Sequence, residues 1–542
     1  MKRVNLSRRE LLAAGLLAPL ATPALAQLAE GPIVDTPSGK VRGLIDHGIL
    51  TFRGLPYGAP TGGANRFMPP QPVKPWKGVR EATLFGSSSP QSNPAGSDPN
   101  VIMRAALPQD PPGVREAEDC LAVNVWTPAV TGKRPVMVWL HGGGFSSGSA
   151  SAPLYDGGNL ARRGDVVFVG VNHRLNVFGY THLASIGGEA FASSGNVGIL
   201  DVVQVLQWVK THIAAFGGDP SNVTIFGESG GGAKVSTVLA MPSAKGLFHK
   251  AIIQSGPGMR SGTAEDGARA AELLISELGL KAGDVRGLQA VPQERLLSAY
   301  FNIQPKLRAA GVTGGTFAPV VDGLALPRHP FDPDSPAVSD DVPLLIGSNR
   351  HEATFPPFMN INATERAIDE AGLLQRIKAG FPKADAEALI GAYRQGNPNA
   401  SPFDLLVLIN TDRIFGANTI VLAERKVARG KAPVYVYRFD WESPAMDGHR
   451  RAMHTMELGF MFDNTIRVAA LVGTGEGNEA LATTMSTAWA NFAHHGTPSA
   501  PGLAAWPAYS PANRKVMVFN TRPWLGDDPA GAERRALLKA LG

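Results

Sequence analysis

The chain is constrained most strongly at residues 223–239, where a short apolar run, a glycine-rich turn and a helix-compatible stretch follow one another. The run 223–226 is β-branched and aromatic, which favours a strand. The next five residues, 227–231, read Gly-Glu-Ser-Gly-Gly and fit the pattern G-x-S-x-G. In that context the sharp strand-to-helix turn holds the serine hydroxyl clear of the sheet. We therefore predict that Ser229 is a nucleophile.

The pentapeptide alone leaves an alternative open, because a glycine-rich turn without a catalytic function has the same composition. A second glycine motif favours the catalytic interpretation, since residues 141–145 read His-Gly-Gly-Gly-Phe and directly follow the apolar run 136–140. A loop of this kind presents backbone N–H groups to an oxyanion hole. We expect the N–H groups of Gly143, Gly144 and Gly230 to stabilise the developing anion, each by roughly 3–4 kcal/mol.

Nearly continuous apolar runs recur along the chain and are typical of strands buried on both faces of a parallel sheet. Between them, residues 201–213 carry apolar side chains with a period near 3.6, which predicts a helix. The pattern predicts the α/β class, with a large, mostly parallel, doubly wound sheet flanked by helices and with helical insertions at 262–310 and 362–428. No clean linker divides residues 27–542, so we expect one catalytic domain. The candidate strands are 33–34, 40–44 and 49–53 in an antiparallel edge, then 121–126, 136–140, 166–171, 223–226, 251–253, 344–346, 434–439 and 516–519 in the parallel part.

Residues 1–26 have the composition of an export signal. Four basic residues precede an apolar run at 11–21 that is too short to span a bilayer. Ala-Leu-Ala at 24–26 supplies a cleavage site, and Arg8 and Arg9 form a twin-arginine pattern. The alternative is an ordinary Sec signal with two adjacent arginines. We expect a periplasmic or secreted protein, exported by the twin-arginine route and without a membrane anchor.

The charge balance gives no indication of a nucleic-acid partner, because removing residues 1–26 lowers the net charge from +5 to +2. Cys120 is the only cysteine, which excludes an intramolecular disulfide. This is compatible with export of a chain that has already folded in the reducing cytoplasm. Cys120 lies in an apolar run, so a buried and unreactive thiol is expected.

The predicted nucleophile needs a general base and an acid that orients the base, usually in the order serine, acid, histidine. Spacing alone does not select among the downstream histidines. His494 and His495 are expected at the surface, in a polar turn. His454 follows a buried strand on a loop that could return to the sheet, and Glu352 follows another strand at the carboxyl edge where catalytic acids lie. The other candidates are His249, His329, His351 and His449.

Several segments resemble the type-B carboxylesterase family, which includes the cholinesterases. Residues 118–126 resemble its E-D-C-L-x-L-N-V motif, and residues 217–231 resemble its nucleophile signature. Residues 171–179, 251–256 and 489–492 also match. The resemblance covers almost the whole chain after the signal and implies an α/β-hydrolase fold. It also implies the following roles: nucleophile Ser229, acid Glu352, base His454, and oxyanion donors Gly143, Gly144 and Gly230.

Three positions depart from the family pattern. Gly230 stands where alanine is usual, but it keeps the N–H group that an oxyanion hole needs. The acid motif, usually D-E-G, reads His-Glu-Ala at 351–353 and leaves the geometry of the acid loop open. Ser89 stands where the family has the cysteine that pairs with the position of Cys120. The loop that it would anchor is therefore expected to be unstapled and more mobile.

The residues and the resemblance together predict hydrolysis of a carboxylic ester through an acyl-enzyme. No metal or organic cofactor is implied, and the expected partner is a small-molecule ester of unknown structure. Activity should rise with pH as His454 loses its proton. Two alternatives stay open: a non-catalytic binding protein, since the family includes adhesion members, and an amidase or transesterase.

Overall fold

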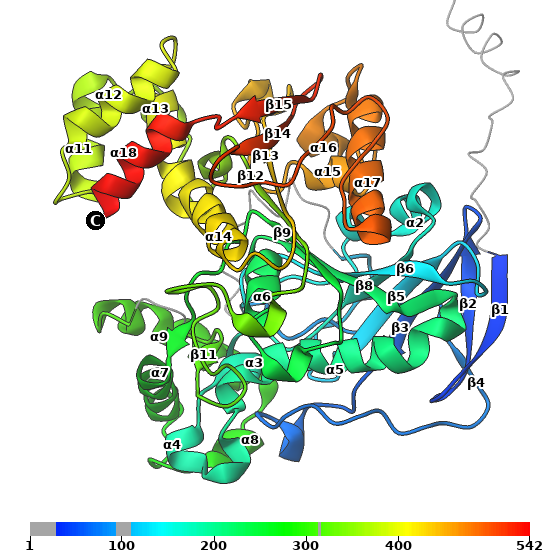
Figure 1. Cartoon of the computed structure of the whole chain (residues 1–542). Coiled ribbons are helices and arrows are strands. Elements are labelled where there is room, and N and C mark those ends of the chain that lie inside the picture. The colour runs from blue at the N-terminus through cyan, green and yellow to red at the C-terminus, as the bar shows by residue number, and fades with distance from the viewer. Residues whose placement is uncertain (1–28, 94–109, 313–315) are drawn as a thin grey trace, which may run out of the picture.

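The computed structural model of the chain describes residues 29–93, 110–312 and 316–542 (Figure 1). The predicted export signal, 1–26, lies outside the described residues. The main sheet has the strand order β1-β2-β3-β5-β7-β6-β8-β9-β12-β13-β14-β15, with β4 paired to β2. Its strands are β1 (Ala29–Thr36), β2 (Gly39–Asp46), β3 (Ile49–Pro56), β4 (Val79–Glu81), β5 (Ala122–Thr127), β6 (Arg134–Leu140), β7 (Val167–Val171), β8 (Gly218–Glu228), β9 (Lys250–Gln254), β12 (Leu344–Asn349), β13 (Val434–Phe439), β14 (Lys515–Phe519) and β15 (Trp524–Asp527).

The centre of this sheet is parallel, from β7 through β6, β8, β9, β12 and β13 to β14. The antiparallel edge predicted at the N-terminus is confirmed, because β1, β2 and β3 pair antiparallel. The prediction of a parallel strand at 121–126 is wrong. That segment forms β5, which is antiparallel to both of its neighbours. Its side chains are buried on both faces, so its continuous apolar run does not differ from that of a parallel strand.

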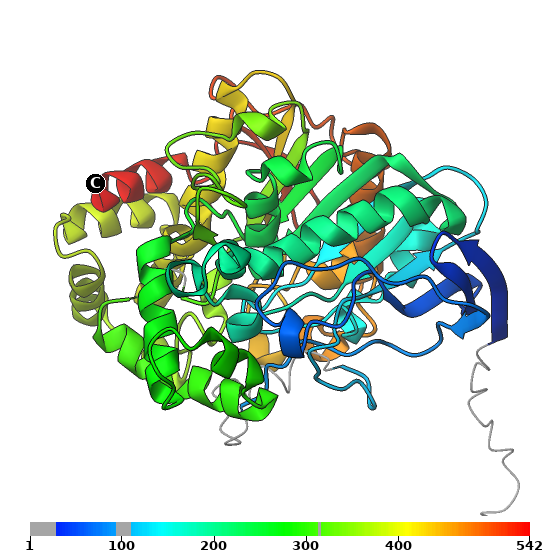
Figure 2. The ribbon, with the colours of Figure 1, turned by 90° about the horizontal axis from the view of Figure 1, so that it is seen from below.

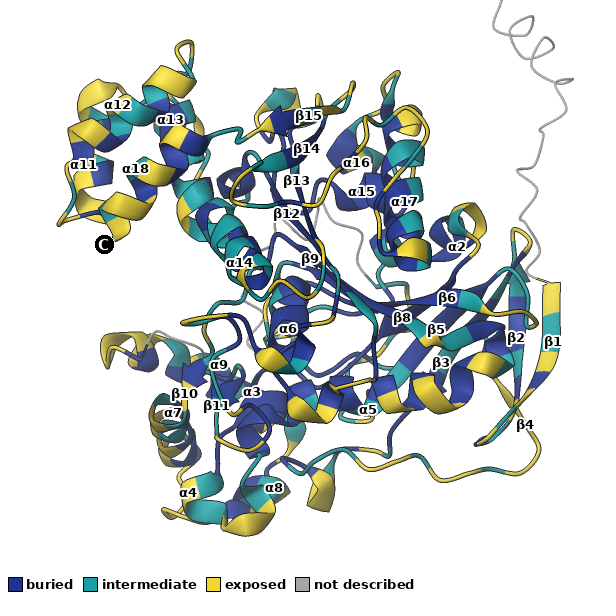
Figure 3. Ribbon diagram, viewed as in Figure 1, coloured by how far each residue is buried: buried dark blue, intermediate teal, exposed yellow. Residues whose placement is uncertain are grey.

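Helices cover both faces of the sheet, and successive side chains of a strand enter different cores. On β6, Val138 packs in the core beneath α5 (Val197–His212) and α6 (Gly230–Val238). The next residue, Trp139, packs on the opposite face with Trp489 of α17 (Asn478–His495). This alternation follows from the two-residue period of a strand. Figure 2 shows α5 lying across one face of the sheet, and Figure 3 shows that the sheet between the helices is buried.

The predicted helical insertions are confirmed and lie on one side of the molecule (Figure 1). The first contains α7 (Ala264–Glu277), α8 (Val285–Ala290) and α9 (Gln293–Ala309), flanked by the small sheet of β10 (Gly262–Thr263) and β11 (Val320–Val321). The second contains α10 (Ala363–Arg366), α11 (Glu370–Gly380), α12 (Ala386–Gly396), α13 (Pro402–Thr411) and α14 (Ala417–Ala428). The remaining helices are α2 (Gly158–Gly164), α3 (Asn176–Tyr180), α4 (Ala184–Gly187), α15 (Leu458–Met461), α16 (Ala469–Val472) and α18 (Gly531–Leu541).

A π-helical turn, Asp412–Gly416, joins α13 to α14, so that Pro402–Ala428 is one continuous helical run. Among the described residues this is the one helix with the length and apolar content to cross a membrane. Half of its most apolar stretch is buried inside the protein. It packs against α11, α12 and α18, as an internal helix does.

Two local predictions have different outcomes. Cys120 is a buried free thiol, as predicted, and the Ser89 hydroxyl lies beside it. Hydrogen bonds from the backbone N–H groups of Gln91 and Ser92 to the Glu116 carboxylate, 2.8 and 2.9 Å long, tie this segment down. Greater mobility of the loop stays a prediction.

The predicted surface position is confirmed for His495, which is exposed, while His494 is half-buried; the prediction that both lie in a polar turn is wrong. Both end α17, and the His494 ring lies 2.8 Å from the carbonyl oxygen of Gly164. The turn begins only at Gly496, whose φ of 73° ends the helix.

Candidate active site

Ser229 occupies a strained turn between β8 and α6. Its φ of 57° and ψ of −123° are unusual for a residue with a side chain, and such strain persists only where the surrounding structure holds it. The Ser229 N–H donates to the Gln254 carbonyl at 2.9 Å, and its own carbonyl accepts from Ala233 N–H at 3.0 Å. Ser229 is partly exposed, whereas Glu228 and Gly230 on either side are buried. The turn therefore leaves this serine accessible, as the motif predicts.

Glycines let α6 approach the loop that follows β6. A Cβ atom added at Gly230 would lie 2.2 Å from the Gly144 carbonyl oxygen, and one at Gly231 would lie 1.9 Å from the Leu140 carbonyl oxygen. Both contacts are with backbone atoms, which cannot rotate away. The departure from the family at position 230 now has a physical reason, because the loop leaves no room for the usual alanine methyl group.

The glycine loop has a backbone conformation that other residues rarely adopt. Gly143 and Gly144 have φ values of 89° and 62°, and the Gly143 carbonyl accepts from Ser147 N–H at 3.1 Å. The N–H groups of Gly143, Gly144 and Gly230 have no acceptor in the part of the chain that the structure describes. Three unpaired donors next to the serine are what an oxyanion hole requires.

Glu352 lies directly after β12, in a short 3-10 helix (Glu352–Thr354), and is fully buried. Its carboxylate accepts three hydrogen bonds. The Asn349 N–H donates at 2.7 Å, the Ser255 hydroxyl at 2.6 Å, and the His454 Nδ1 lies 2.5 Å from Oε2. These donors compensate the loss of hydration of a buried carboxylate.

The altered acid motif keeps an ordinary backbone. Ala353 is buried against Phe403 and Val407, and its N–H donates to the Thr411 hydroxyl at 3.1 Å. It has no positive φ, so the position does not require the family's glycine. His351 is buried, and desolvation followed by the charge of nearby arginines lowers its pKa well below the ordinary value, which keeps it neutral. His351 and Ala353 are thus both accommodated in the loop that carries Glu352.

His454 joins the acid to the nucleophile turn. The imidazole is 1 % exposed. Its Nδ1 contacts Glu352, while its Nε2 lies 3.2 Å from Oε1 of Glu228, the residue before Ser229. The rings of Phe355, Phe358 and Phe415 surround it with centroids 5.0 Å from that of the imidazole. The second nitrogen of the imidazole thus faces the turn that carries the serine.

Two further buried carboxyl groups belong to this region and have no motif of their own. Burial, and then the charge of Glu352, raises the pKa of Glu228 well above its ordinary value, while a hydrogen bond from the Thr455 backbone acts in the opposite direction. Burial and the same two carboxylates raise the pKa of Glu457 to about 8. Glu457 accepts from Asn349 Nδ2 at 2.7 Å. The raised pKa favours the protonated form of the Glu228 carboxyl.

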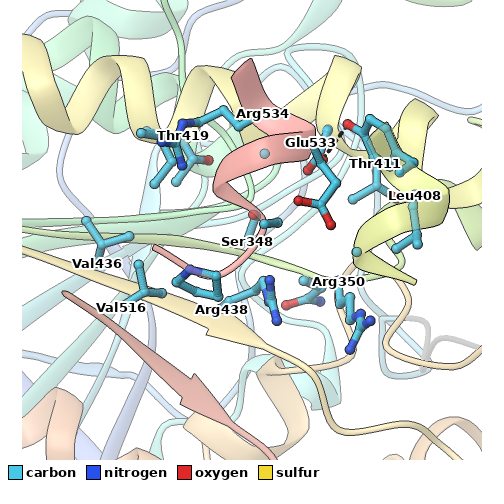
Figure 4. A pocket seen from close by; sticks show the side chains of 18 of the residues that line it. Ser348, Arg350, Leu408, Thr411, Thr419, Val436, Arg438, Val516, Glu533 and Arg534 are labelled. Carbon is cyan, nitrogen blue, oxygen red and sulfur yellow. Dashed lines mark hydrogen bonds between the residues drawn. The ribbon is translucent and has the colours of Figure 1, made fainter. Parts of the chain in front are cut away.

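A separate cavity of about 170 Å³ lies between the sheet and α12, α14 and α18 (Figure 4). Arg438 and Glu533 line it from opposite sides, and the buried Thr419 hydroxyl has no partner among the described residues. None of Ser229, Glu352 and His454 lines this cavity. It is therefore distinct from the site built around the nucleophile turn.

Comparison with known proteins agrees with this geometry. The model of the carboxylesterase family matches residues 30–533. The chain belongs to this family. Its relatives include the para-nitrobenzyl esterase of Bacillus subtilis, 36 % identical over 94 % of this chain and 99 % of that protein, and the phenmedipham hydrolase of Pseudarthrobacter oxydans, 32 % identical over 93 % and 97 %.

Solved structures place this carboxylesterase in the α/β-hydrolase fold. The carboxylesterase EST55 of Geobacillus stearothermophilus has a TM-score of 0.78 and 38 % identity, over 93 % of this chain and 99 % of that one. An esterase from Clostridium hathewayi, described as hydrolysing aliphatic aromatic polyesters, has a TM-score of 0.80 and 32 % identity, over 95 % and 99 %. The chain is a serine carboxylesterase, and the predicted fold class and activity are confirmed.

Proposed function

We propose that Ser229, Glu352 and His454 are the nucleophile, the orienting acid and the base of ester hydrolysis. The observation that carries this proposal is the double contact of the His454 ring. One nitrogen lies 2.5 Å from the Glu352 carboxylate, and the other faces the turn that exposes Ser229. An imidazole held in this way presents the unprotonated nitrogen to a hydroxyl.

In this mechanism His454 Nε2 takes the Ser229 proton while the serine oxygen attacks the ester carbonyl carbon. Glu352 stabilises the imidazolium that forms. The carbonyl oxygen becomes an anion and receives hydrogen bonds from the N–H groups of Gly143, Gly144 and Gly230. The alcohol leaves with the proton from His454, and a water molecule activated by the same nitrogen then frees the carboxylic acid from the acyl-enzyme.

Turnover of p-nitrophenyl acetate by wild-type and variant enzymes would test these roles. Ser229→Ala should lower kcat by about 10⁶-fold, because the nucleophile of a triad cannot be replaced by its neighbours. Ser221→Ala, at an exposed serine, is the matched control and should keep full activity. A Ser229→Ala enzyme with normal turnover would refute the proposal, and a wild-type protein without turnover would favour the binding-protein alternative. Equal rates on the matched amide would favour an amidase.

We also propose that the substrate is an uncharged ester with an apolar or aromatic group. Phe355, Phe358 and Phe415 give the surroundings of the base an aromatic wall, and the relative from Bacillus subtilis is named for a nitrobenzyl ester. Aromatic side chains pair favourably with aromatic ligands. Phe358→Ala should lower kcat/KM for p-nitrobenzyl acetate by about fivefold to tenfold, and that for ethyl acetate by less. A preference for a choline ester over both would contradict this assignment.

We propose, finally, that residues 1–26 direct export by the twin-arginine route. The basic pair Arg8 and Arg9 ahead of the apolar run supports this. In a bacterial host, the double substitution Arg8→Lys and Arg9→Lys should keep the enzyme in the cytoplasmic fraction. The single substitution Lys2→Arg is the control. Export that survives the double substitution and is blocked by azide would indicate the Sec route instead.

A further inference from the structure

A fully buried lysine lies behind the glycine loop. Lys234 is the fifth residue of α6, the helix that starts directly after the predicted nucleophile, and it is 0 % exposed. Its Nζ donates a hydrogen bond of 2.9 Å to the carbonyl oxygen of His141. His141 is the residue between the end of β6 and the first glycine of the loop. The lysine therefore connects the nucleophile helix to the start of the glycine loop.

No counter-charge accompanies this lysine. None of the described carboxylates forms an ion pair with it, and burial alone lowers its pKa, to about 7. Its titratable neighbours are His141 and His173, whose rings stack 5.0 Å apart on the loops after β6 and β7. Burial and the Lys234 charge lower the pKa of both imidazoles well below the ordinary value. The nearest groups are thus neutral, and the ring of Phe145 lies 5.9 Å away.

An ammonium group buried without a partner is costly, because it loses its hydration without a compensating charge. A buried position with only a packing role would be filled at lower cost by an apolar side chain of similar length. The negative charge that this region does receive is the oxyanion of the tetrahedral intermediate. A positive charge fixed in a water-excluded place near that oxygen favours the transition state over the neutral ester.

We infer that Lys234 is a positioning residue of the oxyanion hole: it anchors the His141 carbonyl at the start of the glycine loop and holds a positive charge behind the developing anion. This inference rests on the proposed role of the glycine loop. Lys234 does not touch the substrate and acts through the loop that it holds. The N-terminal end of α6, whose dipole is positive, acts in the same direction.

The inference changes the expected dependence on pH. The lysine carries its charge below about pH 7 and loses it as pH rises. The value of kcat/KM should therefore fall to a lower plateau as the pH rises through about 7 and Lys234 loses its proton. β6, β8, β9 and α5 pack against α6. Of the buried carboxyl groups that they carry, Glu228 of β8 has a raised pKa and Asp201 of α5 is paired with Arg174, and neither forms an ion pair with Lys234.

The experiment uses two substitutions of the buried lysine. Lys234→Met keeps the length and removes the charge, whereas Lys234→Gln removes the charge and keeps an N–H donor. Lys245→Met, at an exposed position, is the control. Both Lys234 variants should lose about 10- to 100-fold in kcat near pH 6.5, with KM changed by less than about threefold. A trifluoromethyl ketone, which forms an oxyanion with the serine, should bind more weakly by the same factor. The descending limb should be absent, so that wild-type and variant rates converge near pH 9, as expected if loss of the ammonium charge is the only difference.

Thermal unfolding separates this role from a structural one. Lys234→Met should unfold at the wild-type temperature or above it, because it removes an unpaired buried charge. Wild-type kcat and an unchanged descending limb in both variants would overturn the inference. If neither variant folds, the inhibition constant of the ketone is measured on the wild-type enzyme across the same pH range. A value that does not change with pH overturns the inference. If only this inference fails, Ser229→Ala is still inactive. If the proposed function fails, Ser229→Ala is active.

Discussion

The two sides of the active site differ in structure: backbone conformation forms the side that carries Ser229, and buried side chains form the side that carries Glu352 and His454. On the nucleophile side the parts are backbone: the strained turn at Ser229, the glycine loop, and the close approach of α6 to that loop at Gly230 and Gly231. On the acid side the parts are buried side chains, with Glu352 and His454 brought together from positions 102 residues apart. The nucleophile side depends on glycines, whose lack of a Cβ atom allows close backbone contacts. The acid side depends on hydrogen-bond donors and charged side chains.

This difference determines which substitutions each side tolerates. An added methyl group should damage the nucleophile side, because it meets a carbonyl oxygen that cannot move away. An isosteric substitution that changes charge or hydrogen bonding should damage the acid side, because the buried Glu352 is held by three hydrogen bonds.

The largest effect should come from the charge on the acid side. Glu352→Gln keeps the shape and removes the charge, so kcat/KM should fall by about 10³- to 10⁴-fold, as in other triads that lose their acid. Glu228→Gln is the matched control and should cost about tenfold or less, because a protonated carboxyl and an amide are similar. Steady-state kinetics on one neutral ester measure both. Equal losses would show that Glu228 carries the negative charge instead.

On the nucleophile side, Gly231→Ala should reduce activity by about 10²-fold, because a misplacement of the loop by about 1 Å is costly for catalysis. Its Cβ would lie 1.9 Å from a carbonyl oxygen. The unfolding free energy should also fall by about 2 kcal/mol. Gly391→Ala, in α12 with no atom within 4 Å of the added Cβ, should instead stabilise the protein by about 0.5 kcal/mol. Similar outcomes for the two variants would remove the contrast.

A smaller loss is expected when one donor to the acid is removed. Ser255→Ala eliminates the 2.6 Å hydrogen bond to Glu352. We expect kcat to fall by about tenfold with KM unchanged, since hydrogen bonds to charged groups contribute about 1.5–3 kcal/mol. Ser221→Ala is again the control. A change confined to KM would place Ser255 in substrate binding rather than in support of the acid.

The change least connected with catalysis is in stability. The pKa of Glu457 is raised from 4.5 to about 8. Between these two pH values the carboxyl is protonated in the folded protein and ionised in the unfolded chain. Unfolding free energy should therefore fall as pH rises from about 5 to about 8, by on the order of 3 kcal/mol. Urea denaturation at both ends measures it. Glu457→Gln should reduce the slope without abolishing it, because Glu228 shifts in the same direction. An unchanged slope would contradict the assignment.

The contrast also explains how much of the site could be predicted from the sequence. Ser229 and the three glycines lie in short local motifs, and the local turn chemistry determines their geometry. Glu352 and His454 lie far apart in the sequence, and spacing left several histidines open. The resemblance to the family, and not the local pattern, selected His454.

The residues that sequence reasoning missed share one property. Lys234, Glu228 and Glu457 have ordinary identities and become distinctive only through burial, which depends on the packing of α6, β8 and the segment after β13. The direction of β5 was missed for a similar reason, because burial on both faces gives parallel and antiparallel strands the same apolar pattern. Burial could be predicted for each strand as a whole, but not for single charged residues.

The most direct test of the central claim is covalent labelling of the folded enzyme with a fluorophosphonate, followed by intact-mass and peptide mass spectrometry. The account predicts one adduct per chain, located at Ser229, and much slower labelling in Glu352→Gln and His454→Ala because the hydroxyl is then no longer activated. Folded, active enzyme that carries the adduct on another residue, or none at all, would contradict the account.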